Sequence, residues 1–323
     1  MNTIQIARIA AAHALIAMFA FAVTADASFS YERDDDHLRI YENGDPVFVY
    51  NSGVNVLEGM DEEHQERYRL SCYVHPLYGL DGDVLTQHFP DDHYHHRGVF
   101  WAWPNVQRGD RHADVWHVDG VRHVFEEWAD IDVEGDTARI VAVAGWQFDD
   151  EDAPFVRETV TIETHPADDV GRAIDFHIHL EGVADETVTI RGQGDRGYGG
   201  FLVRPNAERE PRRITTIFGE HEDDVLESAT PWADYTLGLP DGEGYSGVAT
   251  FQHPDNPGGP THPGWILRHY GFLGKSYPYF DEIVLETGDT FEFKYRLYVH
   301  RGDAEEGRVA EAYHAFVEEV TAE

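Results

Sequence analysis

Residues 93 to 103 read HYHHRGVFWAW and carry three imidazoles, one guanidinium and two indoles. Imidazole titrates near neutral pH and is the most common metal ligand in proteins, so this group indicates proton transfer or metal coordination. A polar loop ahead of a buried strand would explain a lone histidine, but it explains three neighbouring histidines less readily. We therefore expect His95, His96 and Arg97 to be catalytic, and Trp101 and Trp103 to offer flat surfaces for a ligand such as a sugar.

The spacing within this stretch also suits a metal site. If residues 93–97 are extended, their side chains alternate between two faces, and His93, His95 and Arg97 share one of them. Two histidines separated by one residue on a strand are a reasonable spacing for metal ligands. The third ligand would come from elsewhere in the chain, for example from His88, His75 or His117. The sequence therefore allows a divalent metal, with His88, His93 and His95 as candidate ligands.

A second pair of histidines, His177 and His179, has a simpler explanation. The residues around them, Phe176, Ile178 and Leu180, form the apolar face of a strand. Because side chains alternate along a strand, we expect both histidines at polar positions that face solvent or a groove.

A glycine-rich segment at residues 197–204 reads GYGGFLVR. Its three glycines let the backbone approach a ligand closely before Arg204, whose guanidinium suits a carboxylate. This makes Tyr198 and Arg204 candidate catalytic residues, although a plain hairpin connection explains the glycines equally well.

Two later segments add candidate binding residues. HPDNP at residues 253–257 predicts a rigid loop that presents His253 and Asn256, and WILRHYG at residues 265–271 adds Arg268 on an alternating run. Both segments could instead be purely structural loops.

The N-terminus has the form of an export signal. Arg8 precedes an apolar run from Ile9 to Val23, and Ala25-Asp26-Ala27 has the small-x-small pattern of a cleavage site. The run is shorter than the ~20 residues that span a bilayer, which argues against a membrane anchor. We expect cleavage near Ala27 and a secreted or periplasmic mature chain without a membrane span.

Acidic residues dominate the charge, with 61 Asp and Glu against 24 Lys and Arg, for a formal net charge of −37. In molar salt the screening length falls to ~3 Å, so such a surface indicates a saline environment. An acidic surface for a cationic partner is the weaker alternative, because the acids are spread along the chain. Without a basic patch, nucleic acid is an unsuitable partner. The single cysteine, Cys72, excludes an intrachain disulfide.

Short β-rich runs separated by Gly, Pro, Asp or Asn recur along the chain and predict a large antiparallel β-sandwich. These runs cover residues 38–41, 47–50, 99–103, 139–146, 155–163, 172–180, 187–191, 199–204, 212–218, 247–252, 264–270, 282–286 and 290–300. Asp303 and Glu306 form a capping signal before an apolar stripe, which predicts one C-terminal helix at about residues 304–320. No linker or repeat divides residues 28–323, so we expect one domain after the signal peptide of residues 1–27.

Several of these segments together resemble the PmoA-like family. The resemblance rests on HPLY at 75–78, FP at 89–90, HYHHRG at 93–98, DVW at 114–116 and RLYVHRGD at 296–303, and it continues through the glycine-rich and WILRHYG segments. It implies a galactose-mutarotase-like β-sandwich (a supersandwich) and a place in bacterial polysaccharide degradation. This chain has Tyr94 where proline is common in the family. The family's label of a methane oxygenase subunit implies spanning helices, which the mature sequence lacks.

The leading functional hypothesis is a secreted carbohydrate-active enzyme, a lyase or hydrolase that acts on oligosaccharide or polysaccharide with possible uronate units. His95 or His96 with Arg97 would transfer the proton and stabilise negative charge. Tyr78 or Tyr198 would be the complementary acid or base, and Arg204 and Arg268 would hold an acidic sugar. Trp101, Trp103 or Trp116 would supply the aromatic surface on which a sugar ring stacks.

Two other functions remain open at this point. A non-catalytic carbohydrate-binding protein of the same degradation system suits a β-sandwich with aromatic residues, since fold alone does not decide function. A metal-dependent oxygenase is the third possibility, in agreement with the family label.

Overall fold

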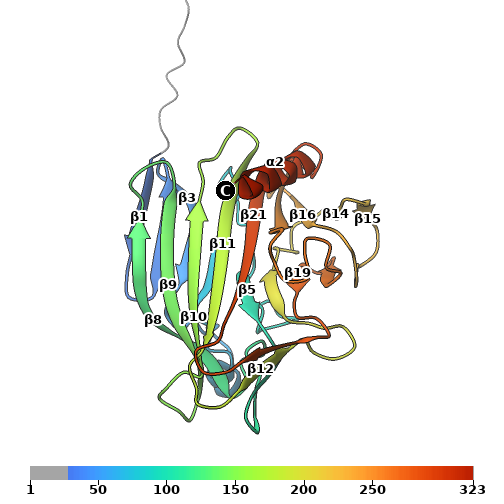
Figure 1. Cartoon of the computed structure of the whole chain (residues 1–323). Coiled ribbons are helices and arrows are strands. Elements are labelled where there is room, and N and C mark those ends of the chain that lie inside the picture. Colours follow the sequence, from blue (N-terminus) through green and yellow to red (C-terminus); the bar gives the residue numbers. More distant parts are fainter. Residues whose placement is uncertain (1–27, 323) are drawn as a thin grey trace, which may run out of the picture.

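The computed structural model describes residues 28–322, and its regular structure consists mainly of antiparallel strands in three sheets (Figure 1). The expected signal peptide lies outside the described residues, so export remains a prediction. Among residues 28–322, no helix is long and apolar enough to cross a membrane.

The first sheet has eight strands and is built from both halves of the chain. Its order is β1 (Phe29–Arg33), β2 (His37–Glu42), β3 (Asp45–Asn51), β4 (Tyr73–Leu77), β5 (Val99–Ala102), β13 (Gly200–Val203), β19 (Phe272–Ser276) and β18 (Trp265–Arg268). The first five strands follow in chain order, whereas β13, β19 and β18 come from the second half. The glycine-rich segment therefore pairs directly with the strand that follows the histidines, with Phe201 opposite Trp101.

The second sheet has nine longer strands. Its order is β15 (Gly219–His221), β14 (Arg212–Thr216), β16 (Trp232–Gly238), β17 (Tyr245–Gln252), β21 (Thr290–Arg301), β11 (Gly171–Gly182), β10 (Val156–Thr164), β9 (Ala138–Phe148) and β8 (Val121–Asp132). Burial alternates residue by residue along β10 and β11, as expected for strands with one face on the core. His177 and His179 lie on the other face of β11, and His177 contacts Glu292 at 2.7 Å, which agrees with the expected polar strand positions.

A small third sheet lies at the opposite end of the molecule from the C-terminal helix (Figure 1). Its strands are β20 (Glu282–Leu285), β12 (Val188–Arg191), β6 (Asn105–Arg108) and β7 (Arg111–Ala113). The loops that leave β7 and β12 carry residues of the candidate site described below.

The main core lies between the two large sheets and is rich in aromatic rings. Trp101 on β5 packs against Phe176 on β11 with ring centroids 6.3 Å apart, and Phe201 on β13 stacks on Tyr295 of β21 at 4.6 Å. Offset and edge contacts of this kind add to the hydrophobic gain of burial. A continuous core of this size explains how the fold holds together with Cys72 as a free, buried thiol.

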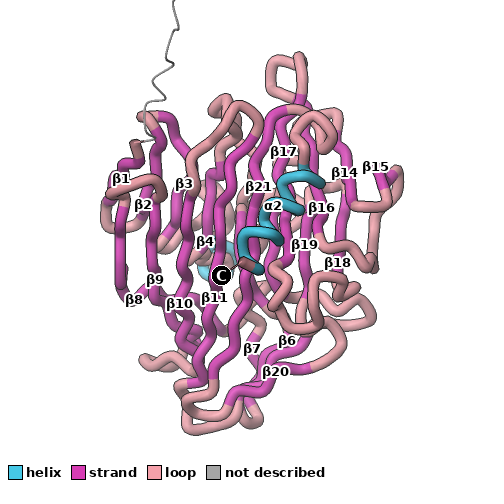
Figure 2. The backbone as a smooth tube through the Cα atoms, turned by 45° about the horizontal axis from the view of Figure 1, so that its top comes forward, coloured by secondary structure: helices cyan, strands magenta, loops and turns pink. Residues whose placement is uncertain are grey.

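The C-terminal helix α2 (Val309–Thr321) covers the outer face of the nine-stranded sheet, over β17 and β21 (Figure 2). Phe251 of β17 contacts Tyr313 and Phe316 of the helix, with ring centroids 5.5 and 6.1 Å apart. The expected capping pair forms, since the amide of Glu306 donates to the Asp303 carboxylate and that of Asp303 to the Glu306 carboxylate. Arg308 is left-handed at φ 52°, so the helix begins after it, at residue 309.

The structure confirms the predicted fold class, a large antiparallel β-sandwich with one C-terminal helix. A short second helix, α1 (Glu62–Arg67), lies in the long connection between β3 and β4. The expected runs on the nine-stranded sheet match strands well, but several strands escape the pattern. These are β1, β4, β6, β7, β8, β15, β16 and β19.

Candidate functional site

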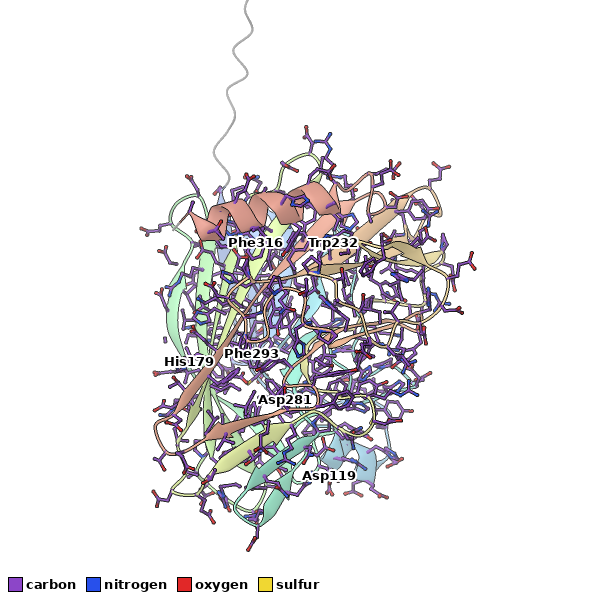
Figure 3. The ribbon with its side chains drawn as sticks, turned by 45° about the vertical axis from the view of Figure 1, so that its right-hand side comes forward. Asp119, His179, Trp232, Asp281, Phe293 and Phe316 are labelled. Atoms are coloured by element: carbon purple, nitrogen blue, oxygen red, sulfur yellow. The ribbon has the colours of Figure 1, made fainter. Side chains whose placement is uncertain are left out.

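Four connecting segments meet around a pocket of about 230 Å³. They are the turns before β5, the loop after β7, the loop between β12 and β13, and the turn between β18 and β19. The side chains lining the pocket are imidazoles and aromatic rings with one amide: His93, His95, His96, Trp116, His117, Gln193, Tyr198, Tyr270 and Phe272. Asp119, which closes the loop after β7, lies at the far end of the molecule from Phe316 on α2 (Figure 3).

The histidine segment consists of tight turns and not of an extended strand. The amide of His93 donates to the carbonyl of Pro90 at 2.9 Å, and the amide of His96 donates to the carbonyl of His93 at 2.9 Å. The expected alternation of faces is therefore wrong, because the turns bring all three imidazoles to one pocket. Gly98 follows, directly before β5, with φ 51°; a Cβ atom there would lie 2.0 Å from the carbonyl oxygen of Val74, so only glycine fits.

Arg204 and Tyr270 hold two of these imidazoles in a stack. The ring of His93 lies parallel to that of His96 at 4.6 Å and to that of Tyr270 at 5.1 Å. One guanidinium nitrogen of the buried Arg204 lies 3.2 Å from Nδ1 of His96, and another donates to Asp92 at 2.7 Å. Because a guanidinium only donates, Nδ1 of His96 accepts and its Nε2 carries the proton.

Burial keeps the inner imidazoles neutral. Loss of solvent, together with the smaller effects of the neighbouring His117, His93 and Arg97, lowers the pKa of His95 to about 2. Burial likewise holds the pKa of His96 well below its usual value. Neither ring nitrogen of His95 has a hydrogen-bond partner within residues 28–322, although the ring lines the pocket. His95 therefore offers a neutral donor and acceptor to a ligand.

The carboxylate beside this stack stays ionised. Burial alone would raise the pKa of Asp92, but the hydrogen bond from Arg204 and the contact with His93 outweigh it, and the pKa lies below its usual value. The negative charge of Asp92 thus balances the positive charge of Arg204, and Arg204 orients the ring of His96.

His117 is oriented by Asp114, and sequence reasoning considered it only as a possible third metal ligand. Oδ2 of Asp114 lies 2.8 Å from Nδ1 of His117, and Oδ1 accepts the His117 amide at 2.8 Å. Since a carboxylate only accepts, Nδ1 of His117 carries the proton and Nε2 keeps its lone pair. The ring of His117 lies 4.4 Å from that of His95. The Asp-x-x-His spacing was the available signal for this pair.

Tyr198 faces the same pocket and is supported by Arg268. A guanidinium nitrogen of Arg268 donates to the Tyr198 hydroxyl at 3.0 Å, and a second donates to Asp224 at 3.2 Å. The ring of Tyr198 packs edge-on against Trp116, with centroids 5.9 Å apart. The Tyr198 oxygen thus accepts a charge-assisted hydrogen bond, and its own O–H group can donate to a ligand in the pocket.

Three expected site residues lie in the core instead. Arg97 is 1% exposed, donates to the carbonyl of His95 at 3.1 Å and lies over the ring of Phe100. Trp101 and Trp103 are each 1% exposed and pack between the sheets, so their expected role as a stacking wall does not fit their burial. Trp116 does line the pocket, together with the unexpected Tyr270 and Phe272.

Tyr78, His253 and Asn256 lie away from this pocket. Tyr78 follows β4, and its amide donates to the carbonyl of Val47. His253 lines a separate groove beside α2, next to Phe316, and Asn256 bonds both the amide and the carbonyl of Lys294. The structure therefore brings together His95, His96, Tyr198, Arg204 and Arg268, but not the His253 loop.

The three candidate metal ligands are not brought together either. His88 stacks on His75 with ring centroids 4.0 Å apart and contacts the Tyr73 hydroxyl at 3.2 Å, whereas His93 and His95 line the pocket. Within residues 28–322, no group of three or more His, Cys, Asp or Glu side chains is arranged to hold a metal ion. The residues present thus do not fit the expected metal set.

Solved structures with a related architecture are distant. An α-galactosidase from Lactobacillus brevis is 8% identical over 85% of this chain and 39% of its own, with a TM-score of 0.43. A GalM/aldose epimerase homologue from C. elegans is 7% identical over 85% of this chain and 99% of its own, with a TM-score of 0.32. A polysaccharide lyase is 10% identical over 87% of this chain and 33% of its own, with a TM-score of 0.31. This chain spans less than half of the α-galactosidase and of the lyase, and such likeness carries no argument about function.

A search of curated protein sequences finds no match. The model of one family, DUF6807, described as a family of unknown function, matches residues 37–314, which is most of the chain. This description does not support the methane oxygenase label that the sequence resemblance implied. The chain belongs to the DUF6807 family of unknown function.

Proposed function

We propose that this protein is a carbohydrate-active enzyme that cleaves uronate-containing oligosaccharides by elimination at the histidine pocket. One observation carries the proposal. An imidazole oriented by a carboxylate, His117, and a phenol supported by a guanidinium, Tyr198, line the same small pocket as two neutral imidazoles.

The two oriented groups suit the two proton transfers of an elimination. Nε2 of His117 takes the proton from the sugar carbon next to the carboxylate, and the electrons of that C–H bond form a C=C bond. The bond from the neighbouring carbon to the glycosidic oxygen breaks, and the Tyr198 hydroxyl protonates the leaving oxygen. Arg268 stabilises the phenolate that remains, and Asp114 stabilises the imidazolium.

Hydrolysis is less well supported by the same residues. Most glycoside hydrolases use two carboxylic groups about 5–9.5 Å apart across the bond that breaks. None of the described side chains lining the pocket is Asp or Glu. The carboxylates nearby, Asp92 and Asp114, are engaged with Arg204 and His117.

The remaining lining suits recognition of one sugar unit. The neutral ring nitrogens of His95 are free to exchange hydrogen bonds with hydroxyl groups, and Trp116 and Tyr270 supply aromatic faces. A pocket of about 230 Å³ is smaller than the ~300–1,000 Å³ of typical drug-sized sites, so it admits one unit of a chain at a time. The same features also suit a non-catalytic binding protein, which is the second candidate function.

We also propose that the enzyme acts outside the cytoplasm, after cleavage near Ala27. The small-x-small pattern at residues 25–27 supports this. Mass spectrometry of the N-terminus of protein recovered from the periplasm or medium tests it, and a retained Met1 would contradict it.

The test of function is turnover on a panel of uronate and neutral oligosaccharides, followed by the absorbance of the new C=C bond and by reducing ends. We expect wild-type turnover on a uronate substrate, and losses of about 10²–10⁴-fold for His117→Gln and Tyr198→Phe, the usual contribution of a positioned acid or base. His177→Gln, at an exposed strand position paired with Glu292, is the matched control and should keep full activity. Tight binding without turnover would favour the binding protein, and full activity of both pocket variants would refute the proposed roles.

A further inference from the structure

The short helix α1 ends beside the turns that carry the pocket histidines. Tyr68, its C-terminal capping residue, lies 5.9 Å from Tyr94 between ring centroids, and His64 lies 6.0 Å from the same ring. Tyr94 belongs to the turns that carry His93 and His95. The guanidinium of Arg67 lies over the Tyr68 ring at 5.4 Å. The last turn of α1 thus packs against Tyr94, between two histidines of the pocket.

Arg67 also contacts the loop that carries Trp116 and His117. One of its guanidinium nitrogens lies 3.8 Å from a carboxylate oxygen of Asp119. The amide of Asp119 donates to the carbonyl of Asp114 at 3.0 Å, which closes the loop carrying Trp116 and His117. The charge of Arg67 is also among the causes that lower the pKa of His95. Arg67 therefore sits between the histidine turns and the Asp114–Asp119 loop.

Three of the arginines near the pocket are already engaged. Arg204 donates to Asp92, Arg268 donates to Asp224 and Tyr198, and Arg97 is buried in the core. Arg67 is different, because it donates no hydrogen bond to any residue between 28 and 322 and its side chain is 46% exposed. Its contact with Asp119 is long and open to solvent, so an incoming anion can replace it.

We propose that Arg67 binds the substrate carboxylate at the mouth of the pocket and so selects uronate over neutral sugar units. This inference rests on the proposed elimination and names the group that recognises its substrate. A guanidinium offers two parallel N–H donors that match a carboxylate. Neutralising that carboxylate makes the adjacent C–H bond more acidic, which is the bond that His117 must break. In a molecule with a formal net charge of −37, an acidic substrate needs such a local positive group.

The test compares a uronate oligosaccharide with its methyl ester, which is the same sugar without the charge. Arg67→Gln should raise KM for the free acid about tenfold and leave KM for the ester unchanged. Arg67→Lys should recover part of the loss in affinity, because lysine keeps the positive charge but lacks the two parallel N–H donors of the guanidinium. Arg157→Gln is the matched control, since Arg157 lies on β10 of the nine-stranded sheet, is 43% exposed and contacts Glu126 at 3.3 Å.

The outcomes separate this inference from the proposed function. If wild type turns over the free acid and Arg67→Gln changes the acid and the ester equally, the elimination stands and the role of Arg67 is refuted. If wild type turns over no uronate substrate, the proposed function fails and the role of Arg67 falls with it. Circular dichroism of Arg67→Gln checks that α1 still forms, and a lower melting temperature with an unchanged acid-to-ester ratio also counts against the proposal.

Discussion

Asp114→Asn tests the hypothesis that His117 is the base. The substitution keeps the size of the side chain, and its amide oxygen can still accept the backbone amide of His117 as Oδ1 does at 2.8 Å. The second contact changes character, because an NH₂ group then faces Nδ1 of His117 where a carboxylate oxygen lies at 2.8 Å. An NH₂ group donates to Nδ1 and so moves the proton to Nε2, the nitrogen that must accept the substrate proton.

The size of the effect follows from the bond that is lost. A hydrogen bond to a charged group contributes about 1.5–3 kcal/mol, and each 1.4 kcal/mol is a factor of ten, so kcat should fall about 10- to 150-fold. The wrong tautomer adds to this loss, and removal of the corresponding Asp in a serine protease lowers kcat about 10⁴-fold. The free energy of unfolding should change by less than about 1 kcal/mol, because this partly exposed pair contributes little to stability.

The chain supplies its own control for this experiment. Asp34 and His37 have the same spacing and a similar geometry, in which Oδ1 of Asp34 accepts the His37 amide at 2.8 Å and also lies 3.0 Å from Nδ1 of His37. That pair lies at the turn from β1 into β2, and neither residue lines the pocket. We expect Asp34→Asn to keep full kcat on the uronate substrate. Asp114→Asn should show the lowered kcat given above, with an unchanged melting temperature. Full activity of Asp114→Asn, or an equal loss in both variants, would refute the reasoning.

Three further predictions concern pH, packing and salt. Burial lowers the pKa of His95 to about 2 and that of His75 to about 3, so below about pH 6.5 the unfolded chain binds more protons than the folded one. The free energy of unfolding should therefore decrease as the pH is lowered, by up to about 2 kcal/mol for each histidine at pH 5. Urea unfolding at pH 7 and 5 measures this loss, which His95→Gln should reduce. Trp101→Ala should lower the free energy of unfolding by about 3–5 kcal/mol, and a loss below 1 kcal/mol would contradict its place in the core. Raising NaCl from ~0.1 to ~1 M shortens the screening length from ~10 to ~3 Å and should raise the melting temperature, whereas a constant or falling value would argue against a saline habitat.

Alternation made most of the nine-stranded sheet predictable. β10 and β11 alternate buried and partly exposed residues, so their pattern is visible without a structure. β16 is buried at every position and includes Asp234, whose carboxylate lies 2.8 Å from His300 in the core, so no alternation marks it. β8 is an edge strand with several acidic residues on its exposed positions, and it resembles a polar loop in sequence.

The composition of the site was easier to predict than its geometry. The concentration of imidazoles at 93–96 indicated a site, and these side chains do line the pocket. Their orientation depends on two turns, and alternation cannot describe a turn. The approach of His117 to His95 depends on how the loop after β7 folds back, which no local pattern encodes. His253 lies elsewhere because its loop leaves β17 on the second sheet, a placement fixed by tertiary packing.

The pocket takes its lining from four stretches of chain that begin at residue 93 and end at residue 272. Any fragment that stops before Tyr270 therefore lacks the ring that stacks on His93, and it also lacks β19, which pairs with β13 beside the glycine-rich loop. During synthesis the site is completed only after the last quarter of the chain begins to emerge. In a ribosome-bound nascent chain the pocket would thus stay incomplete until the sandwich is nearly closed.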